Sequence, residues 1–487
     1  MPQEFTEVDA PSQLPDERRG TDPDTPVPAP TDLRTLLTLA WPLIVSNSLT
    51  TIQILIDRLF LSWVDLDVAS ASTAAVMVYW LPYIFLFSTA GYVATFVAQY
   101  TGAGRPQRVG PAVWQGLYFS IAAGIAMLAL LPAAGPIFAA MGHAEHLQDQ
   151  EAKFFRCMCW YALPGVLTAT VSAFFAGRGQ SQVVILISGV GLVVNAVLDY
   201  CWIFGNFGFP AMGIEGAGWA TVSGAWASAI VGLGLMFRKR YRDENAIGSG
   251  WRFDPALFRR LMRFGVPSAA QWALDITAFN AFVIMTGWFG AGELGVTSLV
   301  ITINNVAFIP MIGVGQAVAI LVGNKLGENR PAAAERLTWL GMAIAGGYMG
   351  SVALLYILVP DLFIAPFQGD NNAVNWQLIA DRVVVVLWFV AAFSVFDAAN
   401  IVLSFALRGA GDTVFVSLVS LVLAWPVMVI PTYGAYKFGW GLYWAWGFAS
   451  LYIALQATCF LTRFRGGKWK AMRVIEPAVI ETPTDEK

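Results

Sequence analysis

Charged residues are scarce in this chain, and that scarcity excludes most soluble proteins. Only 13% of the 487 residues are charged and 57% are hydrophobic, whereas a soluble globular chain is roughly 25% charged. So few charges cannot cover the surface of a soluble protein of this size. The formal net charge of −3 also excludes a nucleic-acid-binding protein, which needs a basic face. The composition predicts a membrane protein whose main partner is the lipid bilayer.

Cysteine and histidine are also rare, which argues against metal and nucleophile chemistry. The four cysteines form no Cys-x-x-Cys pair and lie in or beside apolar runs, where we interpret them as small buried hydrophobic residues. His143 and His146 share one loop with two acidic residues, and no further metal ligands accompany them. The sequence contains no zinc motif, Ser–His pair or nucleotide-binding loop. We therefore expect neither an enzyme nor a cofactor.

Long apolar runs are what the sequence does contain, and a membrane helix needs about 20 such residues. Twelve runs are long enough, at residues 36–62, 68–99, 111–133, 153–176, 183–205, 212–237, 260–289, 294–323, 335–359, 381–407, 413–436 and 440–463. The predicted fold is an all-α membrane protein with twelve transmembrane helices.

The basic residues predict the orientation of these helices, because lysine and arginine concentrate in cytoplasmic loops. Of the 29 basic residues, 24 fall in the tails and the even-numbered loops, 4 fall in the odd-numbered loops, and Arg58 ends the first span. Both termini are therefore predicted to be cytoplasmic, in a multi-pass protein of the inner (plasma) membrane. The predicted segments are a disordered cytoplasmic tail (1–34), a first lobe (35–237), a cytoplasmic connector (238–263), a second lobe (264–465) and a cytoplasmic tail (466–487).

The two predicted lobes also match each other in sequence. Pro42 corresponds to Pro267, and Gly102 with its Gly-x-x-Arg-Pro motif corresponds to Gly327, both at an offset of 225. A third match, residues 177–181 with 409–413, lies at an offset of 232. Because the offset contains six spans, both halves have the same topology. They are expected to be related by a pseudo-twofold axis along the membrane normal, which favours alternating access.

Polar residues inside the first lobe form a candidate cation site, because carboxylates within a membrane are costly and usually functional. Asp57 lies in the first span, while Asn195 and Asp199 are one turn apart in the fifth. Asp57 and Asp199 lie about 31 Å and 24 Å from the cytoplasmic ends of their spans at 1.5 Å per residue. Thr221 in the sixth span reaches a similar depth. Oxygen ligands suit Na⁺, and the carboxylates also suit a proton.

The second lobe carries its own buried carboxylates, Asp275 in the seventh span and Asp397 in the tenth. Gln271 adds a polar side chain one turn before Asp275. A structural role remains the alternative for every one of these residues. For Asp57 this would be an ion pair with Arg58, for Asp199 a hydrogen bond to Asn195, and for the second-lobe pair helix packing.

At these residues the chain resembles the multidrug and toxic compound extrusion (MATE) family of secondary antiporters, over about 430 residues from Leu36 to Arg465. The resemblance rests on the order and spacing of seven signals: Trp41–Pro42, Asp57, GlyAlaGlyArgPro at 102–106, AsnAlaValLeuAsp at 195–199, GlyIleGluGlyAlaGlyTrpAlaThr at 213–221, GlyGluAsnArgPro at 327–331 and LeuArgGlyAlaGlyAsp at 407–412.

The resemblance implies two six-helix lobes that form a V and export driven by Na⁺ or H⁺. It also implies a first-lobe cation site at Asp57, Asn195, Asp199 and Thr221. In the NorM-like branch it implies a second-lobe site at Asp275, where Glu is common, and at Asp397. A Tyr is often found one turn before the latter, and here that position is Phe393.

The implied function is a monomeric antiporter that exports amphipathic, often cationic, organic compounds in exchange for Na⁺ or H⁺. We expect Asp275, Asp397, Gln271 and Phe393 to contact the small-molecule substrate. The alternative is a flippase of related fold for a lipid-linked precursor. That role favours a cationic cleft for pyrophosphate, whereas the basic residues of this chain lie mostly in the predicted cytoplasmic segments.

Overall fold

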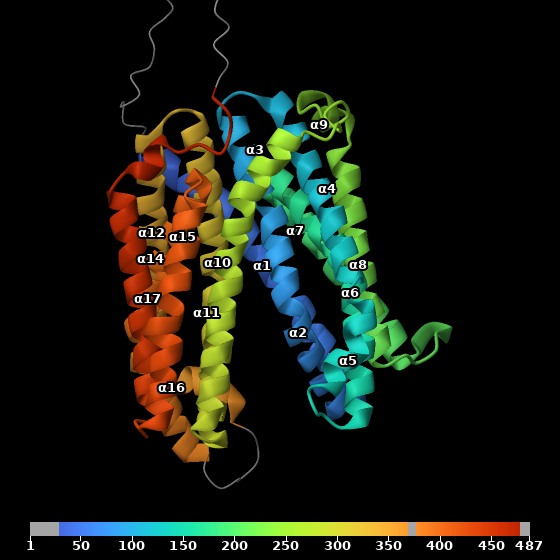
Figure 1. Ribbon diagram of the computed structural model, residues 1–487, viewed down its shortest axis with the longest axis vertical. Coiled ribbons are helices and arrows are strands. Elements are labelled where there is room, and N and C mark those ends of the chain that lie inside the picture. The colour runs from blue at the N-terminus through green and yellow to red at the C-terminus, as the bar shows by residue number, and fades with distance from the viewer. Residues whose placement is uncertain (1–28, 369–375, 478–487) are drawn as a thin grey trace, which may run out of the picture.

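The computed structural model describes residues 29–368 and 376–477, and in these ranges the chain is helical without any β-strand. Two groups of long helices stand side by side (Figure 1). The first lobe contains α1 (Ala29–Val64), α2 (Leu66–Gly91), α3 (Val93–Gly102), α4 (Val109–Leu128), α5 (Ala134–Ala139), α6 (Glu145–Gly177), α7 (Ser181–Phe204) and α8 (Ile214–Met236). The second contains α10 (Pro255–Trp288), α11 (Ala291–Gly327), α12 (Pro331–Leu358), α13 (Asp361–Ile364), α14 (Trp376–Ala410), α15 (Thr413–Leu423), α16 (Ile430–Lys437) and α17 (Leu442–Arg465).

The short helix α9 (Lys239–Glu244) lies between the lobes in sequence. In space it lies near the end of α3 and the start of α4 (Figure 1). We call this side of the molecule, where α1 begins and the described chain ends, the terminal side. Of the predicted tails (1–34 and 466–487), residues 1–28 and 478–487 lie outside the described residues, whereas residues 29–34 form the start of α1.

All twelve predicted spans coincide with helices. Within the described residues, eleven helical segments are long and apolar enough to cross a membrane. The twelfth, α10, is 34 residues long, but Gln271, Asp275 and Asn280 make it more polar. It packs in the second lobe against α11 and α15. The predicted all-α fold in two lobes is therefore confirmed.

Several helix boundaries follow from local chemistry. The Asp65 carboxylate accepts a hydrogen bond from the Asp67 backbone N–H at 2.9 Å and begins α2, because the first N–H groups of a helix lack partners within it. Asp254 caps α10 in the same way, with Pro255 at the first helical position. The predicted second span is divided at Tyr92 into α2 and α3, and the eleventh contains a π-helical stretch, Ala424–Val429.

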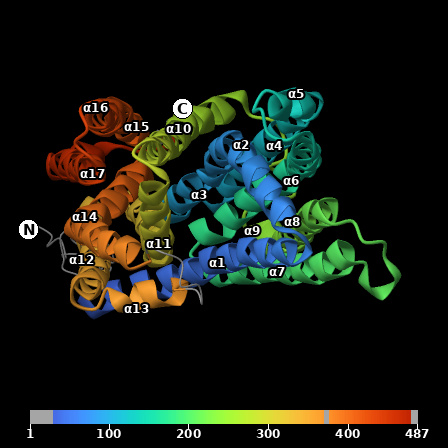
Figure 2. The same ribbon diagram turned by 90° about the horizontal axis from the view of Figure 1, so that it is seen from below.

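The packing between the lobes confirms the pseudo-twofold relation. The sequence repeat pairs α1 with α10 and the α2–α3 span with α11. Across the interface α1 packs against α11, and α10 packs against α2. Exchanging the lobes converts the first contact into the second, as a twofold axis requires. In Figure 2, α1 lies beside α11 on the lower side of the view, and α10 lies beside α2 on the upper side.

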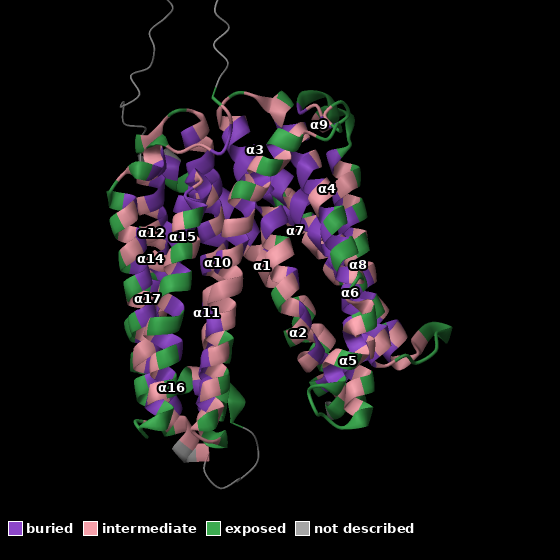
Figure 3. Cartoon of the chain, in the orientation of Figure 1, coloured by how far each residue is buried: buried purple, intermediate pink, exposed green. Residues whose placement is uncertain are grey.

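Three apolar clusters show where the lobes join. The largest contains buried residues from both lobes, such as Phe96 and Val97 of α3 with Leu321 of α11. The other two stay within one lobe each, around Phe155 in the first and Trp446 in the second. Buried residues accordingly concentrate near the terminal side in Figure 3, and the lobes diverge towards the opposite side.

Two glycines of the repeat permit this joint. A Cβ on Gly102 would lie 2.0 Å from the Asn324 carbonyl oxygen, and one on Gly327 would lie 2.2 Å from the Gln99 oxygen. These distances are far below van der Waals contact, so only glycine allows α3 and α11 to approach this closely. The matched Gly-x-x-Arg-Pro motifs therefore mark a symmetric crossing between the lobes.

The segment after α17 also joins the lobes. Residues 468–477 leave the second lobe and cross the terminal side, with Val474 buried and its N–H bonded to Gln99 Oε1 at 2.9 Å. The carboxylate of Glu476 accepts hydrogen bonds from Tyr100 Oη at 2.7 Å and from Arg108 Nε and Arg260 Nη1 at 2.9 Å each. Tyr100 and Arg108 belong to the first lobe, so Glu476 ties the end of the chain to it.

Candidate cation sites in the two lobes

The four polar residues predicted in the first lobe lie together. Thr221 Oγ1 on α8 donates a hydrogen bond to Asp57 Oδ2 on α1 at 3.4 Å. Asp199 and Asn195 of α7 adjoin Asp57 and are fully buried. The depth argument from the helical rise thus predicted which side chains lie together.

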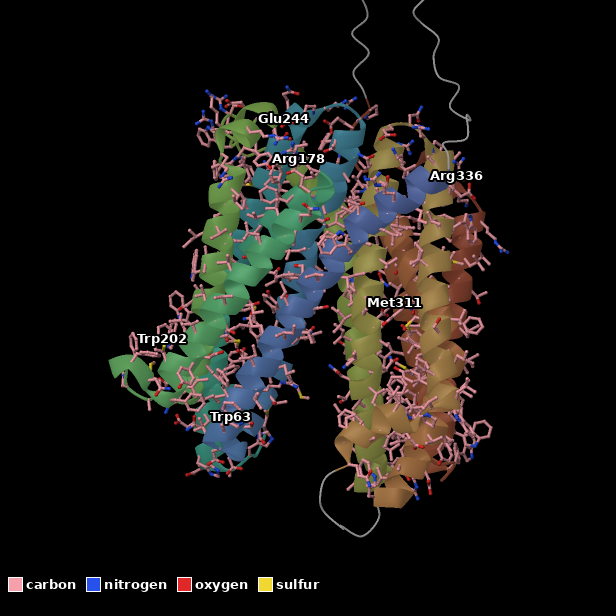
Figure 4. All side chains as sticks on the ribbon, turned by 180° about the vertical axis from the view of Figure 1, so that it is seen from behind. Trp63, Arg178, Trp202, Glu244, Met311 and Arg336 are labelled. Atoms are coloured by element: carbon pink, nitrogen blue, oxygen red, sulfur yellow. The ribbon has the colours of Figure 1, made fainter. Side chains whose placement is uncertain are left out.

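This cluster lies in the half of the lobe away from the terminal side. Trp63, six residues beyond Asp57, marks the far end of α1 in Figure 4, and Trp202, three residues beyond Asp199, marks the far part of α7. At the opposite end Arg178 pairs with Glu244 of α9 at 3.1 Å. Arg178 and Glu244 therefore lie at the end of the first lobe opposite to this cluster.

Small residues bring α7 and α8 close enough to form the cluster. A Cβ on Gly224 of α8 would lie 2.7 Å from the Gly191 oxygen and 2.9 Å from Asn195 Cβ. One turn further on, Ser228 Oγ donates to the Ile187 oxygen at 2.9 Å. Because this contact fixes the register of the two helices, Asn195 faces the same space as Thr221.

Several oxygen and nitrogen atoms of the cluster lack a protein partner. Asp199 Oδ1 and Oδ2, Asn195 Oδ1 and Nδ2, and Asp57 Oδ1 are buried and make no hydrogen bond to any described residue. Burying such groups without partners is costly, and two adjacent carboxylates add like-charge repulsion. A proton or a small cation bound between them would remove both costs, and the four oxygens suit a hard cation.

In the second lobe, the Asp275 carboxylate is more completely hydrogen-bonded. Asp275 Oδ1 accepts from Tyr452 Oη at 2.7 Å and from Gln456 Nε2 at 3.4 Å, while Oδ2 accepts from Gln271 Nε2 at 3.3 Å. Asp397 of α14 is buried beside Asn400. The two carboxylates thus belong to one polar region, reached from α10, α14 and α17.

The remaining predicted residue, Phe393, lies in the apolar cluster of the second lobe. It is one turn before Asp397 on α14, and it contributes packing where a tyrosine would add a hydroxyl. The hydroxyl donor to the acidic residue of α10 comes instead from Tyr452 of α17.

Sequence reasoning missed Tyr452, Gln456, Ser420 and Asn400 as members of this region. Tyr452 and Gln456 are four residues apart in an apolar span, and this spacing on one helical face was an available signal. It also missed the burial of Arg408, which we assigned to a cytoplasmic loop. Its guanidinium lies 4.0 Å above the Phe405 ring and 5.5 Å from the Trp272 ring.

The sequence matches a known protein family in both lobes. The MatE family model matches residues 42–201 and 267–433, one stretch in each lobe and more than half of the chain. The chain belongs to the MatE family. The MATE resemblance predicted from the motifs is thus confirmed, and proteins of this family are transporters rather than enzymes and need no cofactor.

Relatives of this MATE chain share most of its length. A "Probable multidrug resistance protein NorM" from Mesorhizobium japonicum is 30% identical over 439 residues, covering 89% of this chain and 93% of the relative. A protein of the same name from Brucella suis is 28% identical over 436 residues, covering 88% and 92%. These relatives support the NorM-like assignment.

The fold has close counterparts among solved structures. One is a multidrug resistance MATE family transporter of the MOP superfamily in an outward-facing conformation. It aligns with a TM-score of 0.81 at 19% identity, covering 90% of this chain and 97% of that one. A MATE structure in a bent conformation also aligns with a TM-score of 0.81 at 19% identity. At this level of sequence identity, both similarities are evidence for the fold alone.

Proposed function

We propose that this MATE protein exports amphipathic, often cationic, organic compounds in exchange for Na⁺ or H⁺ by alternating access. The observation that carries the proposal is the set of unpartnered carboxylate and amide atoms at Asp57, Asn195 and Asp199 inside a transporter fold. A coupling cation that binds there neutralises charges that are otherwise buried without compensation. The names of the curated relatives agree with multidrug export.

The second lobe is proposed to receive the organic substrate and a second cation. Asp275 and Asp397 supply negative charge, and Gln271 and Phe393 supply a polar and an aromatic contact nearby. A cationic substrate and a coupling cation that use the same carboxylates compete, because one buried charge is not neutralised twice. By thermodynamic linkage each weakens the binding of the other to the same extent.

We further propose that the terminal side faces the cytoplasm of a cell whose inner membrane holds the protein as a monomer. The 24 to 4 division of basic residues supports this orientation. The lobes are joined on the terminal side and diverge on the other, so the described conformation would then be open to the outside.

Transport by the purified protein in proteoliposomes tests the proposed function. Imposing a Na⁺ gradient and a pH gradient separately is expected to drive accumulation of a cationic fluorescent dye with one of them. Transport that responds to neither gradient contradicts cation-coupled export. Movement of a lipid-linked pyrophosphate in place of the dye favours the flippase.

The orientation has its own test. A cysteine at exposed Gly248 is expected to resist a membrane-impermeant maleimide added to the outside of intact cells, and to react once the cells are permeabilised. His146→Cys, on the opposite side and with an exposed side chain, is the matched control and is expected to react in intact cells. The unsubstituted protein, whose own cysteines are buried or half-buried, gives the background. Efficient external labelling at position 248 would show that the protein has the opposite orientation.

A further inference from the structure

Two residues of α17 that no motif identified face the second-lobe carboxylates. Tyr452 and Gln456 are one helical turn apart and share a face. The Tyr452 hydroxyl donates to Asp275 Oδ1 at 2.7 Å. Gln456 Nε2 donates to the same oxygen at 3.4 Å and to Ser420 Oγ of α15 at 2.7 Å. Gln456 is only 1% exposed, so its hydrogen bonds are protected from exchange with solvent.

The other end of the Gln456 amide leads to Asp397. Gln456 Oε1 accepts a hydrogen bond from Asn400 Nδ2 at 3.0 Å. Asn400 lies three residues after Asp397 on α14, and its side chain adjoins the Asp397 carboxylate. A continuous chain of side chains therefore runs from Asp397 through Asn400 and Gln456 to Asp275.

This chain has a defined direction. Each side-chain amide has one donor group and one acceptor oxygen. Because Asn400 donates to Gln456 Oε1, the Gln456 NH₂ group points at Asp275. Asn400 Oδ1 is buried and has no hydrogen-bond partner among the described residues. It is thus the acceptor available to Asp397 when that carboxyl group carries a proton.

We propose that Gln456 and Tyr452 are positioning residues of the second-lobe site. Through them, binding of a proton or cation at Asp397 changes the binding of a proton or cation at Asp275. The inference rests on the proposed cation exchange in this lobe. An ionised Asp397 attracts the Asn400 NH₂ group, whereas a protonated one donates to its oxygen. Either change moves the Asn400 NH₂ group, which orients Gln456. It therefore changes how strongly Gln456 stabilises the ionised form of Asp275.

Other charges near Asp275 are few. Arg408 and Asp397 from α14 and Tyr452 from α17 are the ionisable groups that interact with it. The helix α15 contributes Ser420 and contains no ionisable residue. On α2, α11 and α16, which also pack against α10, the charged residues lie in the first or last turn. The amide chain is therefore the direct polar connection between the two carboxylates within the described residues.

The test measures how much Na⁺ or H⁺ displaces half of a bound cationic dye, rhodamine 6G, from the purified protein. Gln456→Leu removes the amide at similar size, and Tyr452→Phe removes only the hydroxyl. Each is expected to change the half-displacing cation concentration by about tenfold, the effect of one hydrogen bond to a charged group. The displacement is read relative to the dye affinity of each variant at the lowest cation concentration, and a cooperative thermal unfolding transition shows that each variant is folded.

Ser450→Ala is the matched control, because Ser450 lies on the same helix and its hydroxyl bonds only to its own backbone, at the Trp446 oxygen. Combining Gln456→Leu with Asp397→Asn is expected to give less than the sum of the two single shifts, since both break one chain. If Gln456→Leu and Tyr452→Phe behave like Ser450→Ala while Asp275→Asn shifts the displacement, the inference is wrong and the proposed function stands. If Asp275→Asn also changes nothing, the second-lobe exchange fails and the inference fails with it.

Discussion

Replacement of Asp199 by asparagine is expected to abolish coupled export while the protein still inserts into the membrane. Asparagine keeps the shape of the side chain but removes the charge. Asp199 is fully buried beside Asp57, and neither of its carboxylate oxygens has a protein partner. A cation or proton exchanged at this position therefore loses its main counter-charge. The measurement is dye export against its gradient by reconstituted protein at matched protein-to-lipid ratio.

Asp361→Asn is the control for Asp199→Asn, because Asp361 is an exposed carboxylate in the first turn of α13. It is expected to leave export unchanged. Normal uphill export by the Asp199 variant would mean that this carboxylate is structural. Asp57 would then be the only carboxylate of the first-lobe cluster available to bind a cation or proton.

Substitution of Gly327 by alanine is expected to open the joint between the lobes on the terminal side. The added methyl group would lie 2.2 Å from the Gln99 oxygen, which is a backbone atom and cannot rotate away. Overpacking of this kind costs about 1–3 kcal/mol, or about a fivefold to 150-fold shift in the balance between the joined and separated states. Gly102→Ala, at the symmetric position, is expected to act in the same direction.

The measurement for the glycine variants is the distance between spin labels placed on the terminal ends of the two lobes. Both variants are expected to broaden it towards longer values and to slow export. Gly346→Ala on α12, where an added Cβ meets nothing within 4 Å, is the matched control. An unchanged distance in both variants would show that the helices slide without separating, and that this crossing does not control the joint.

The clustering of the first-lobe polar residues could be predicted because these residues obey a rule internal to each helix. Asn195 and Asp199 are one turn apart, and a fixed rise per residue places Asp57 and Thr221 at a comparable depth. Depth along parallel helices is therefore accessible from sequence once the spans are found. The same regularity, with the paired motifs at Gly102 and Gly327, gave the twofold relation.

The second-lobe network could not be predicted, because it depends on how helices rotate about their own axes. Gln456 meets Asp275 only because α17 and α10 turn those faces towards each other, and no spacing within one helix encodes this. The burial of Arg408 has the same origin, since it depends on the faces that α14 and α10 turn towards each other. Val474, which crosses between the lobes, lies in a short segment with no helical period to reveal it.

The contact at Glu476 gives the end of the chain an influence on ligand affinity. Burial alone would raise the pKa of Glu476, but the hydrogen bond from Tyr100 and the charge of Arg108 lower it below its usual value. The carboxylate therefore stays ionised at neutral pH, and its contribution is lost only as acid protonates it. A conformation open to the terminal side that separates residues 468–477 from the first lobe would break this contact. A ligand that binds only that conformation has an apparent dissociation constant multiplied by the inverse of its population. Substitution of Glu476 is thus expected to change drug affinity from outside the membrane, without altering any residue proposed to touch the drug.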